Sequence, residues 1–258
     1  MSVKPDPSGF PQRKVTEVRG VSAVQMRDVQ RVAQEEFGVD ILQITENAGR
    51  AASLLALAML GGRGRGQRIV ILCGGGNKGA AGLTAARHLS NWGFRIDPII
   101  CGVEEEAAFM VRRQLQTLRY AGILEPADLE SSEITVEDQL ADADLVIDAL
   151  IGYGLEGAPQ GIASAVTQLS LQAARPTLAL DVPTGVNATT GEVSTPAIRA
   201  CTTLMLDLPK RGVLELGARH HTGELFLADI GIPRSVHERL GVSIPGVFSE
   251  GPIVRLRR

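Results

Sequence analysis

Short runs of β-branched residues alternate with helical patterns along most of this chain, and this alternation limits the possible folds more than any other feature. The first run, Arg68–Cys73 (RIVILC), has the length and composition of a strand that is buried on both faces. A stretch with helical spacing, Ala80–Trp92, follows it. Strands and helices that alternate in this way form a mostly parallel sheet covered by helices. The sequence therefore predicts a single-domain α/β protein, a three-layer α/β/α sandwich.

The same pattern places the remaining elements. Further strands are expected at Arg95–Cys101, Asp144–Leu150, Thr177–Asp181, Cys201–Leu206 and Glu224–Ala228. Helices are expected within Val21–Leu60, around a turn that holds Ile44–Gly49, and at Glu104–Tyr120 and Gln160–Ala173. We expect residues 1–14 to form a flexible arm, residues 15–240 to form the domain and residues 241–258 to form a tail with a solvated basic end.

Charge and composition narrow the classes of function. A net charge of −3 gives no general attraction to a phosphate backbone, and 3% aromatic residues are too few for a base-stacking platform. The longest mainly apolar stretch, Ala51–Leu60, is too short to span a bilayer. The three widely spaced cysteines, Cys73, Cys101 and Cys201, fit a reducing compartment. We therefore expect a cytoplasmic protein that binds a small molecule, and neither nucleic acid nor a membrane.

Three glycine-containing polar loops each follow an expected strand. They are Gly74–Gly82 (GGGNKGAAG), Asp148–Gly157 (DALIGYGLEG) and Asp181–Gly185 (DVPTG). The carboxyl ends of parallel strands share one edge of a sheet, so the three loops should meet there. Glycine allows a ligand to approach the backbone closely, and the N-terminus of the following helix favours a phosphate. The first loop has neither the dinucleotide nor the Walker spacing, so taken alone it could be a simple strand-to-helix turn.

Two aspartates, Asp148 and Asp181, stand at the ends of buried strands. A carboxylate in such a position is costly unless it has a partner. Each aspartate could cap a helix or brace its own loop. Together they could instead hold a cation, or one of them could act as a general base.

Three further motifs complete a recognisable series: Glu46–Arg50 (ENAGR), Pro209–Gly212 (PKRG) and Asp229–Pro233 (DIGIP). In this order, the six motifs resemble those of the NAD(P)H-hydrate epimerase family, the YjeF N-terminal domain. The resemblance implies a Rossmann-like sandwich, a homodimer, and an isomerase that interconverts the R and S forms of hydrated NADH or NADPH. It also implies a nicotinamide nucleotide as substrate, a potassium ion near the substrate phosphates, and no organic redox cofactor.

The resemblance also assigns roles to individual residues. It implies that Asp181 contacts the substrate, and we expect Asp181 to be the acid/base catalyst. Asp148 and Thr184 are the implied potassium ligands, with Thr184 in place of a serine. The other implied substrate-binding residues belong to the first two loops: Gly75, Gly76, Asn77, Lys78, Gly79, Gly152, Tyr153, Gly154, Leu155 and Gly157.

Lys78 is the most informative departure from the family pattern, because it stands where the family has an asparagine that binds potassium. Two like charges about 4 Å apart at an effective dielectric constant of about 20 repel by roughly 4 kcal/mol. Lys78 therefore either points into solvent or replaces the ion. Our hypothesis is replacement, with the Lys78 ammonium paired to Asp148 and contributing to the catalytic site.

The other departures are Ala81 in place of an aspartate, Tyr153 in place of a small or different side chain, and Thr45 in place of a methionine. They leave three interpretations open: an epimerase, the same scaffold adapted as an isomerase or lyase of another small substrate, or a non-catalytic nucleotide-binding or scaffold domain. The retained carboxylates Asp148 and Asp181 speak against the last of these.

Overall fold

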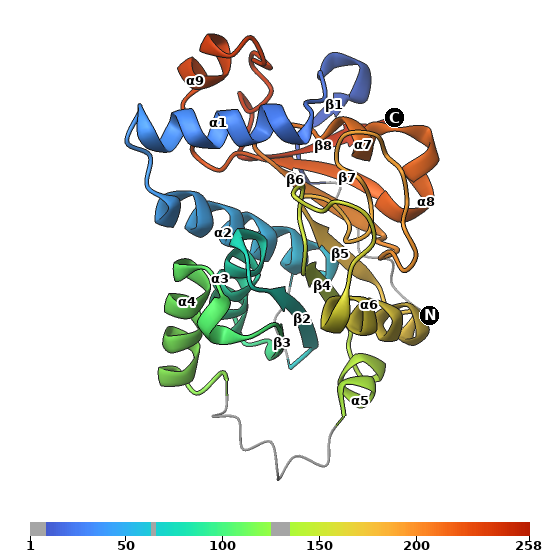
Figure 1. Ribbon diagram of the computed structural model, residues 1–258. Coiled ribbons are helices and arrows are strands. Elements are labelled where there is room, and N and C mark those ends of the chain that lie inside the picture. The colour runs from blue at the N-terminus through green and yellow to red at the C-terminus, as the bar shows by residue number, and fades with distance from the viewer. Residues whose placement is uncertain (1–8, 63–65, 125–134) are drawn as a thin grey trace.

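The computed structural model describes residues 9–62, 66–124 and 135–258, and its centre is one mostly parallel sheet (Figure 1). The strand order is β1-β8-β7-β6-β5-β4-β2-β3, and the pair β7–β8 is antiparallel while the other pairs are parallel. The strands are β1 Gln12–Lys14, β2 Arg68–Gly74, β3 Arg95–Cys101, β4 Leu145–Ala149, β5 Thr177–Leu180, β6 Thr202–Leu206, β7 Glu224–Ala228 and β8 Ile253–Arg257. All six expected strands are present.

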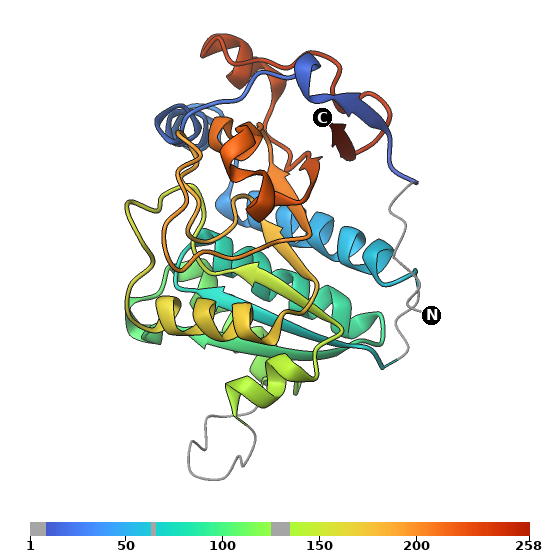
Figure 2. The same cartoon turned by 90° about the vertical axis from the view of Figure 1, so that its right-hand side faces the viewer.

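Helices cover both faces of this sheet, as Figures 1 and 2 show for α3 on one side and α6 on the other. The helices are α1 Ala23–Glu35, α2 Ile41–Met59, α3 Asn77–Asn91, α4 Phe109–Tyr120, α5 Val136–Ala141, α6 Gly161–Ala173, α7 Arg211–Leu214, α8 Arg219–Thr222 and α9 Arg234–Arg239. Within the described residues, each of these helices is too short or too polar to cross a membrane.

The alternation of side chains along β2 explains the three layers. Ile69 and Ile71 belong to the large apolar cluster formed with α2, α3 and α4. Val70 and Leu72 point the other way and belong to the cluster that contains residues of α5 and α6. A strand buried on both faces needs apolar residues at all its buried positions, and β2 has them after its first residue, Arg68. The predicted three-layer α/β/α sandwich is confirmed.

Both ends of the chain differ from the expectation of a free arm and a free tail. Gln12–Lys14 pairs with β8, and β8 pairs with β7, so both segments extend the sheet. Val254 and Leu256 are buried against β7, because their alternation gives the strand one apolar face. The assigned limits of the domain at residues 15 and 240 are therefore wrong at both ends. Residues 1–8 of the expected arm lie outside the described residues.

Two helix boundaries also differ from the expected ones, and both matter for the site. Helix α3 begins at Asn77 instead of Ala80, so Asn77 and Lys78 lie in its first turn. Helix α2 is continuous over Ile41–Met59, and the stretch Ile44–Gly49 lies inside it instead of in a turn. The capping box of Asp40 and Gln43 starts this helix earlier than its alanine-rich half suggests.

Candidate active site at the carboxyl edge of the sheet

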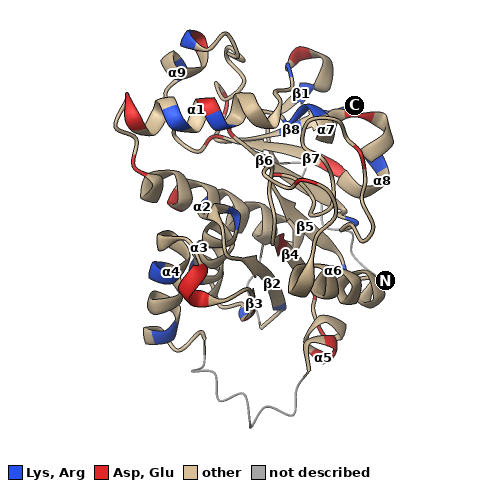
Figure 3. Cartoon of the chain, viewed as in Figure 1, with Lys and Arg blue, Asp and Glu red and all other residues tan. Residues whose placement is uncertain are grey.

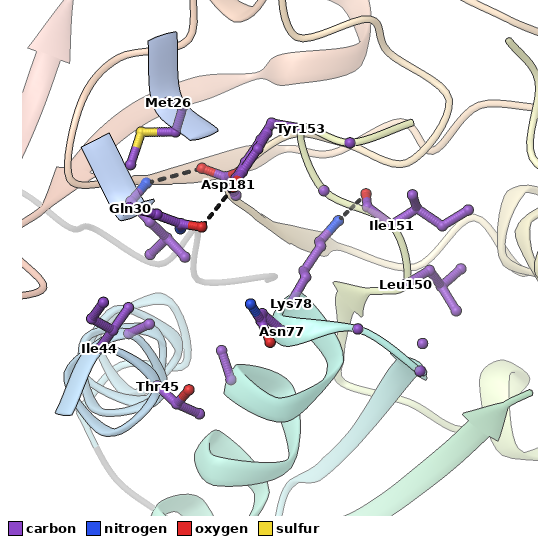
Figure 4. A pocket seen from close by; sticks show the side chains of 18 of the residues that line it. Met26, Gln30, Ile44, Thr45, Asn77, Lys78, Leu150, Ile151, Tyr153 and Asp181 are labelled. Atoms are coloured by element: carbon purple, nitrogen blue, oxygen red, sulfur yellow. Dashed lines mark hydrogen bonds between the residues drawn. The ribbon is translucent and has the colours of Figure 1, made fainter. Parts of the chain in front are cut away.

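A cavity of about 570 Å³ opens at the carboxyl ends of β2, β4 and β5. Figure 4 shows side chains from helices α1 and α2 facing those of the glycine-containing loops across it. The loop residues that line it include Gly74, Gly75, Gly76, Asn77, Lys78, Leu150, Ile151, Gly152, Tyr153, Gly154 and Asp181. The prediction that the loops meet at one edge is confirmed, and the volume is typical of small-molecule sites.

Helix α3 begins so close to the end of β2 that it tolerates no side chain at Gly79. A Cβ there would lie 1.8 Å from the carbonyl oxygen of Gly74. Gly75, Gly76 and Asn77, just before and at the helix start, are exposed to the cavity side of the loop. This close approach directs the first backbone N–H groups of α3 to the cavity, where they can bind an anionic group.

The ammonium group of Lys78 is surrounded by oxygen atoms from the end of β4 and from the loops that follow β4 and β5. Its Nζ lies 3.0 Å from Asp148 Oδ2 and donates to the carbonyl oxygens of Ile151 at 3.0 Å and Val182 at 2.8 Å. Thr184 Oγ1 is more distant, at 3.4 Å. The Lys78 side chain is only 6% exposed, so it does not point into solvent.

Asp148 is the one charged residue of β4, which carries a red segment in Figure 3. It is completely buried and fully hydrogen-bonded. Its Oδ1 accepts from the backbone N–H of Leu150 and the hydroxyl of Thr184, and its Oδ2 accepts from the backbone N–H of Thr184 and from Lys78. Four donors satisfy the acceptor capacity of the carboxylate. Asp148 thus ties three loops together and has no oxygen left for a substrate.

Burial shifts several pKa values around this pair. Desolvation lowers the pKa of Lys78, and the charges of Asp148 and Asp181 oppose that effect. The three close acceptors match the three N–H groups of an ammonium, whereas a neutral amine would turn its lone pair toward an oxygen. Desolvation, reinforced by Asp148, also raises the pKa of Cys101 to about 12. The Cys101 thiol at the cavity wall therefore stays protonated and is a poor nucleophile.

Asp181 follows β5 directly and adopts a left-handed backbone conformation with φ 63°. Aspartate is among the few non-glycine residues that occupy this region. Its Oδ1 lies 2.5 Å from Lys210 Nζ and accepts from the backbone N–H of Leu206 at 3.3 Å. Its Oδ2 lies 3.5 Å from the position that a Cβ on Gly152 would take. One carboxylate oxygen is thus fixed, and the other faces the cavity beside a glycine.

Tyr153 links its loop to α1 across the cavity. Its hydroxyl donates to Gln30 Oε1 at 2.6 Å (Figure 4), and Lys210 Nζ lies 5.9 Å from the centre of its ring. Burial, reinforced by the charge of Asp181, raises the pKa of Tyr153 to about 12. The neutral phenol therefore forms part of the cavity wall nearest Asp181.

Comparisons with known proteins place this chain in one family. Residues 42–212 match the family described as YjeF-related protein N-terminus. The chain belongs to this family. It is 38% identical to an NAD(P)H-hydrate epimerase of Dehalogenimonas lykanthroporepellens, and the alignment covers 90% of each chain. It is 34% identical to a bifunctional NAD(P)H-hydrate repair enzyme of Moorella thermoacetica, and here the alignment covers 84% of this chain but only 41% of the longer relative.

The fold of this YjeF-family chain also matches a solved structure. The crystal structure of a yeast protein, YNL200c, aligns with a TM-score of 0.77 over 93% of this chain and all of that chain. The sequence identity is 19%, so this likeness concerns the fold alone.

The potassium ion that the family resemblance implies does not fit the site of this member. Asp148 and Thr184 are brought together as expected, but the Lys78 ammonium stands between the oxygens that would bind the ion. A cation placed among the same oxygens would meet the ammonium at contact distance, and the two charges would repel.

The structure separates the expected substrate-binding residues into two groups. Asp181 and seven of the loop residues line the cavity: Gly75, Gly76, Asn77, Lys78, Gly152, Tyr153 and Gly154. Gly79, Leu155 and Gly157 do not line it. Gly79 serves the packing of α3 instead, and Gly157 turns its loop with a positive φ of 75°.

The sequence interpretation gave no role to several residues that line the cavity, among them Lys210 and Gln30. Lys210 stands out in the sequence only as part of the Pro209–Gly212 motif, and its burial beside Asp181 is the property that gives it a role. Gln30 lies on α1, whose amphipathic pattern carries no signal that one polar residue faces a cavity. A buried lysine can be recognised only when its carboxylate partner, here distant in the sequence, is known.

Proposed function

We propose that this protein is an NAD(P)H-hydrate epimerase that interconverts the R and S forms of hydrated NADH and NADPH. The observation that carries the proposal is the Asp181 carboxylate, which has one oxygen fixed by Lys210 and the other directed at the cavity. Relatives of similar length that bear this name support it, since the alignment with one of them covers 90% of both chains.

Epimerisation at one carbon breaks a bond there and reforms it on the opposite face, so no atom is gained or lost. A group that takes up a proton when this bond breaks and returns it when the bond re-forms balances both steps. Asp181 Oδ2 fills this role, because it is accessible from the cavity beside Gly152. Lys210 acts as a positioning residue, since it holds Oδ1 and is itself anchored on the carbonyl of Leu206.

The remaining cavity residues bind and orient the nucleotide. The backbone around Gly75, Gly76 and Asn77 at the start of α3 takes the phosphate groups. The apolar wall from α1 and α2, which includes Met26 and Ile44, takes the less polar part of the substrate and limits the access of water. As expected for the family, the protein acts as a homodimer in the cytoplasm.

The substitution Asp181→Asn tests the catalytic role. Asparagine also tolerates a positive φ, and its amide oxygen can still accept from Lys210, so we expect the fold to be retained. The interconversion rate of one purified epimer of hydrated NADH, followed by chromatography, should fall by about 10²–10⁴-fold. The matched control is Asp28→Asn, an exposed position on α1, which should keep the wild-type rate.

A wild-type rate in the Asp181→Asn variant would contradict the role of Asp181. If the wild-type protein does not exceed the uncatalysed rate, the epimerase proposal itself is wrong. Binding of the hydrated nucleotide without turnover, seen as a rise in Tm, would then favour a non-catalytic nucleotide-binding domain. Turnover of a different small substrate would favour the adapted scaffold.

A further inference from the structure

The oxygen atoms around Lys78 Nζ have the composition of an alkali-metal site. They comprise the backbone carbonyls of Ile151 and Val182, one carboxylate oxygen of Asp148 and the hydroxyl of Thr184. Backbone carbonyls are the oxygens that replace the hydration shell of potassium in proteins. The Asp148 oxygen belongs to the end of β4, the other three oxygens belong to the loops after β4 and β5, and Lys78 reaches them from a further element, α3.

The ammonium satisfies this set of oxygens completely. Its three N–H groups match the three acceptors at 2.8–3.0 Å, which belong to Asp148, Ile151 and Val182. The single negative charge of Asp148 is balanced by the single positive charge of Lys78. A potassium ion bound in addition would leave a net positive charge in a site where Asp148 is 0% and Lys78 8% exposed, and such uncompensated burial is costly.

The start of helix α3 positions the Lys78 ammonium among these oxygen atoms. Because α3 begins at Asn77, Lys78 lies in its first turn, directly above the loops after β4 and β5. The methylene groups of Lys78 pass beside Gly152, where a Cβ would lie 3.6 Å from Lys78 Cδ. The Lys78 side chain is thus buried between the loops, and its charged end lies beside the buried carboxylate of Asp148.

From this arrangement we propose that Lys78 is a covalently tethered replacement for a monovalent cation, so that the site is held together without potassium. The tethered ammonium links the end of β4, which carries Asp148, to the loop after β5, which begins with Asp181, at any concentration of the ion. This inference concerns the same site as the proposed function, but it rests on the geometry of the loops and does not require the epimerase activity.

Thermal unfolding in different salts tests the inference. The Tm of the wild-type protein should be the same in potassium, sodium and choline chloride at equal ionic strength. The substitution Lys78→Asn removes the ammonium and leaves space among the oxygen atoms of Asp148, Ile151, Val182 and Thr184. Its Tm should be lower in choline chloride and should rise saturably with potassium, by about 3 °C once the ion is well above its Kd. The control Lys78→Met fills the space without a charge, and potassium should not raise its Tm.

Thallium(I), which scatters X-rays anomalously, locates the ion independently of stability. We expect an anomalous peak between Asp148 and the carbonyl of Val182 in crystals of Lys78→Asn and no such peak in the wild-type protein. A peak in the wild type, or a saturable rise of its Tm that only potassium causes, would overturn the proposal. A folded Lys78→Asn variant that is indifferent to potassium would overturn it as well.

The two wild-type measurements decide the matter even if Lys78→Asn does not fold. A wild-type protein that is insensitive to potassium and binds no thallium(I) among these oxygen atoms supports the proposal that Lys78 is a tethered cation. These readouts are also separate from the proposed function, because a protein that meets them and shows no epimerase activity contradicts only the assignment of the reaction.

Discussion

At the scale of single residues, the site is built on two buried ion pairs, which differ in how many acceptor positions of the carboxylate are occupied. Lys78 lies 3.0 Å from Asp148, and Lys210 lies 2.5 Å from Asp181. Each lysine supplies the partner that a strand-end carboxylate needs when it is buried. All acceptor positions of Asp148 are used within the protein, whereas Asp181 keeps one oxygen directed at the cavity. The first pair therefore holds the loops, and the second is available for chemistry.

Thr45 carries a buried hydroxyl beside the cavity that has no hydrogen-bond partner among the described residues. The residue lines the cavity and is only 2% exposed. The substitution Thr45→Val keeps the shape and removes the hydroxyl. We expect KM for the hydrated nucleotide to rise by up to about tenfold, while the ligand-free protein is as stable as the wild type or more so.

Steady-state kinetics and urea unfolding of Thr45→Val measure these two effects. The control Thr45→Ser retains a hydroxyl and should keep a KM close to that of the wild type. An unchanged KM in Thr45→Val would show that the substrate does not use this hydroxyl.

Tyr153 should make the stability of the protein sensitive to alkaline pH. Its pKa in the folded state is raised to about 12, above the value of about 10 in an unfolded chain. The unfolded state therefore releases this proton first, and the contribution of Tyr153 to stability is present below pH of about 10 and is lost as pH rises toward 12. The substitution Tyr153→Phe removes this dependence.

Urea unfolding at a series of pH values above 9 compares the two proteins. The free energy of unfolding should fall more steeply with pH in the wild type than in Tyr153→Phe. Equal slopes would show that the phenol ionises as easily in the folded protein as in the unfolded chain.

At the scale of elements, the start of α3 determines how the site is assembled. Gly79 lies where a Cβ would meet the carbonyl oxygen of Gly74 at 1.8 Å, and this carbonyl belongs to the backbone and cannot move aside easily. We expect Gly79→Ala to lower the free energy of unfolding by at least about 2 kcal/mol and to displace Lys78. Chemical denaturation measures the loss of stability.

Gly76 provides the matched control three residues earlier. It has nothing within 4 Å of its Cβ position and an ordinary φ of −100°. Gly76→Ala should therefore change stability by no more than about 0.5 kcal/mol. Equal losses in the two variants would show that the close approach at Gly79 is not what positions α3.

At the scale of the whole molecule, one sheet joins all the apolar clusters. Ile69, Val70 and Met205 belong to three different clusters but to strands of the same sheet. We therefore expect the protein to unfold in one cooperative step. The single tryptophan, Trp92, packs against the largest cluster and reports on it. Its fluorescence and the far-UV circular dichroism should change at the same urea concentration.

A transition of Trp92 that precedes the loss of secondary structure would contradict a single cooperative unit. In that case, the helices on the α2–α4 face would unfold apart from the strands β6–β8 at the other end of the sheet.

The sequence alone was sufficient to predict the α/β/α layers, the six central strands and the meeting of three loops at one edge. These features follow from local patterns, since strand composition and the rule for parallel strands do not depend on distant contacts. The strands β1 and β8 were not predicted from the sequence. Each is a short segment near Pro and Gly that becomes a strand only because a neighbouring strand pairs with it.

The tertiary structure alone decided what Lys78 and Lys210 do. The sequence led to the hypothesis that Lys78 pairs with Asp148, but it left open that Lys78 points into solvent, because lysine is ordinarily exposed. Its direction is determined by acceptors on the loops after β4 and β5, which lie about seventy to a hundred residues further along the chain. The sequence shows which residue types lie at the edge of the sheet. Which lysine faces which aspartate depends on the distances between loops, and only the folded chain brings these loops together.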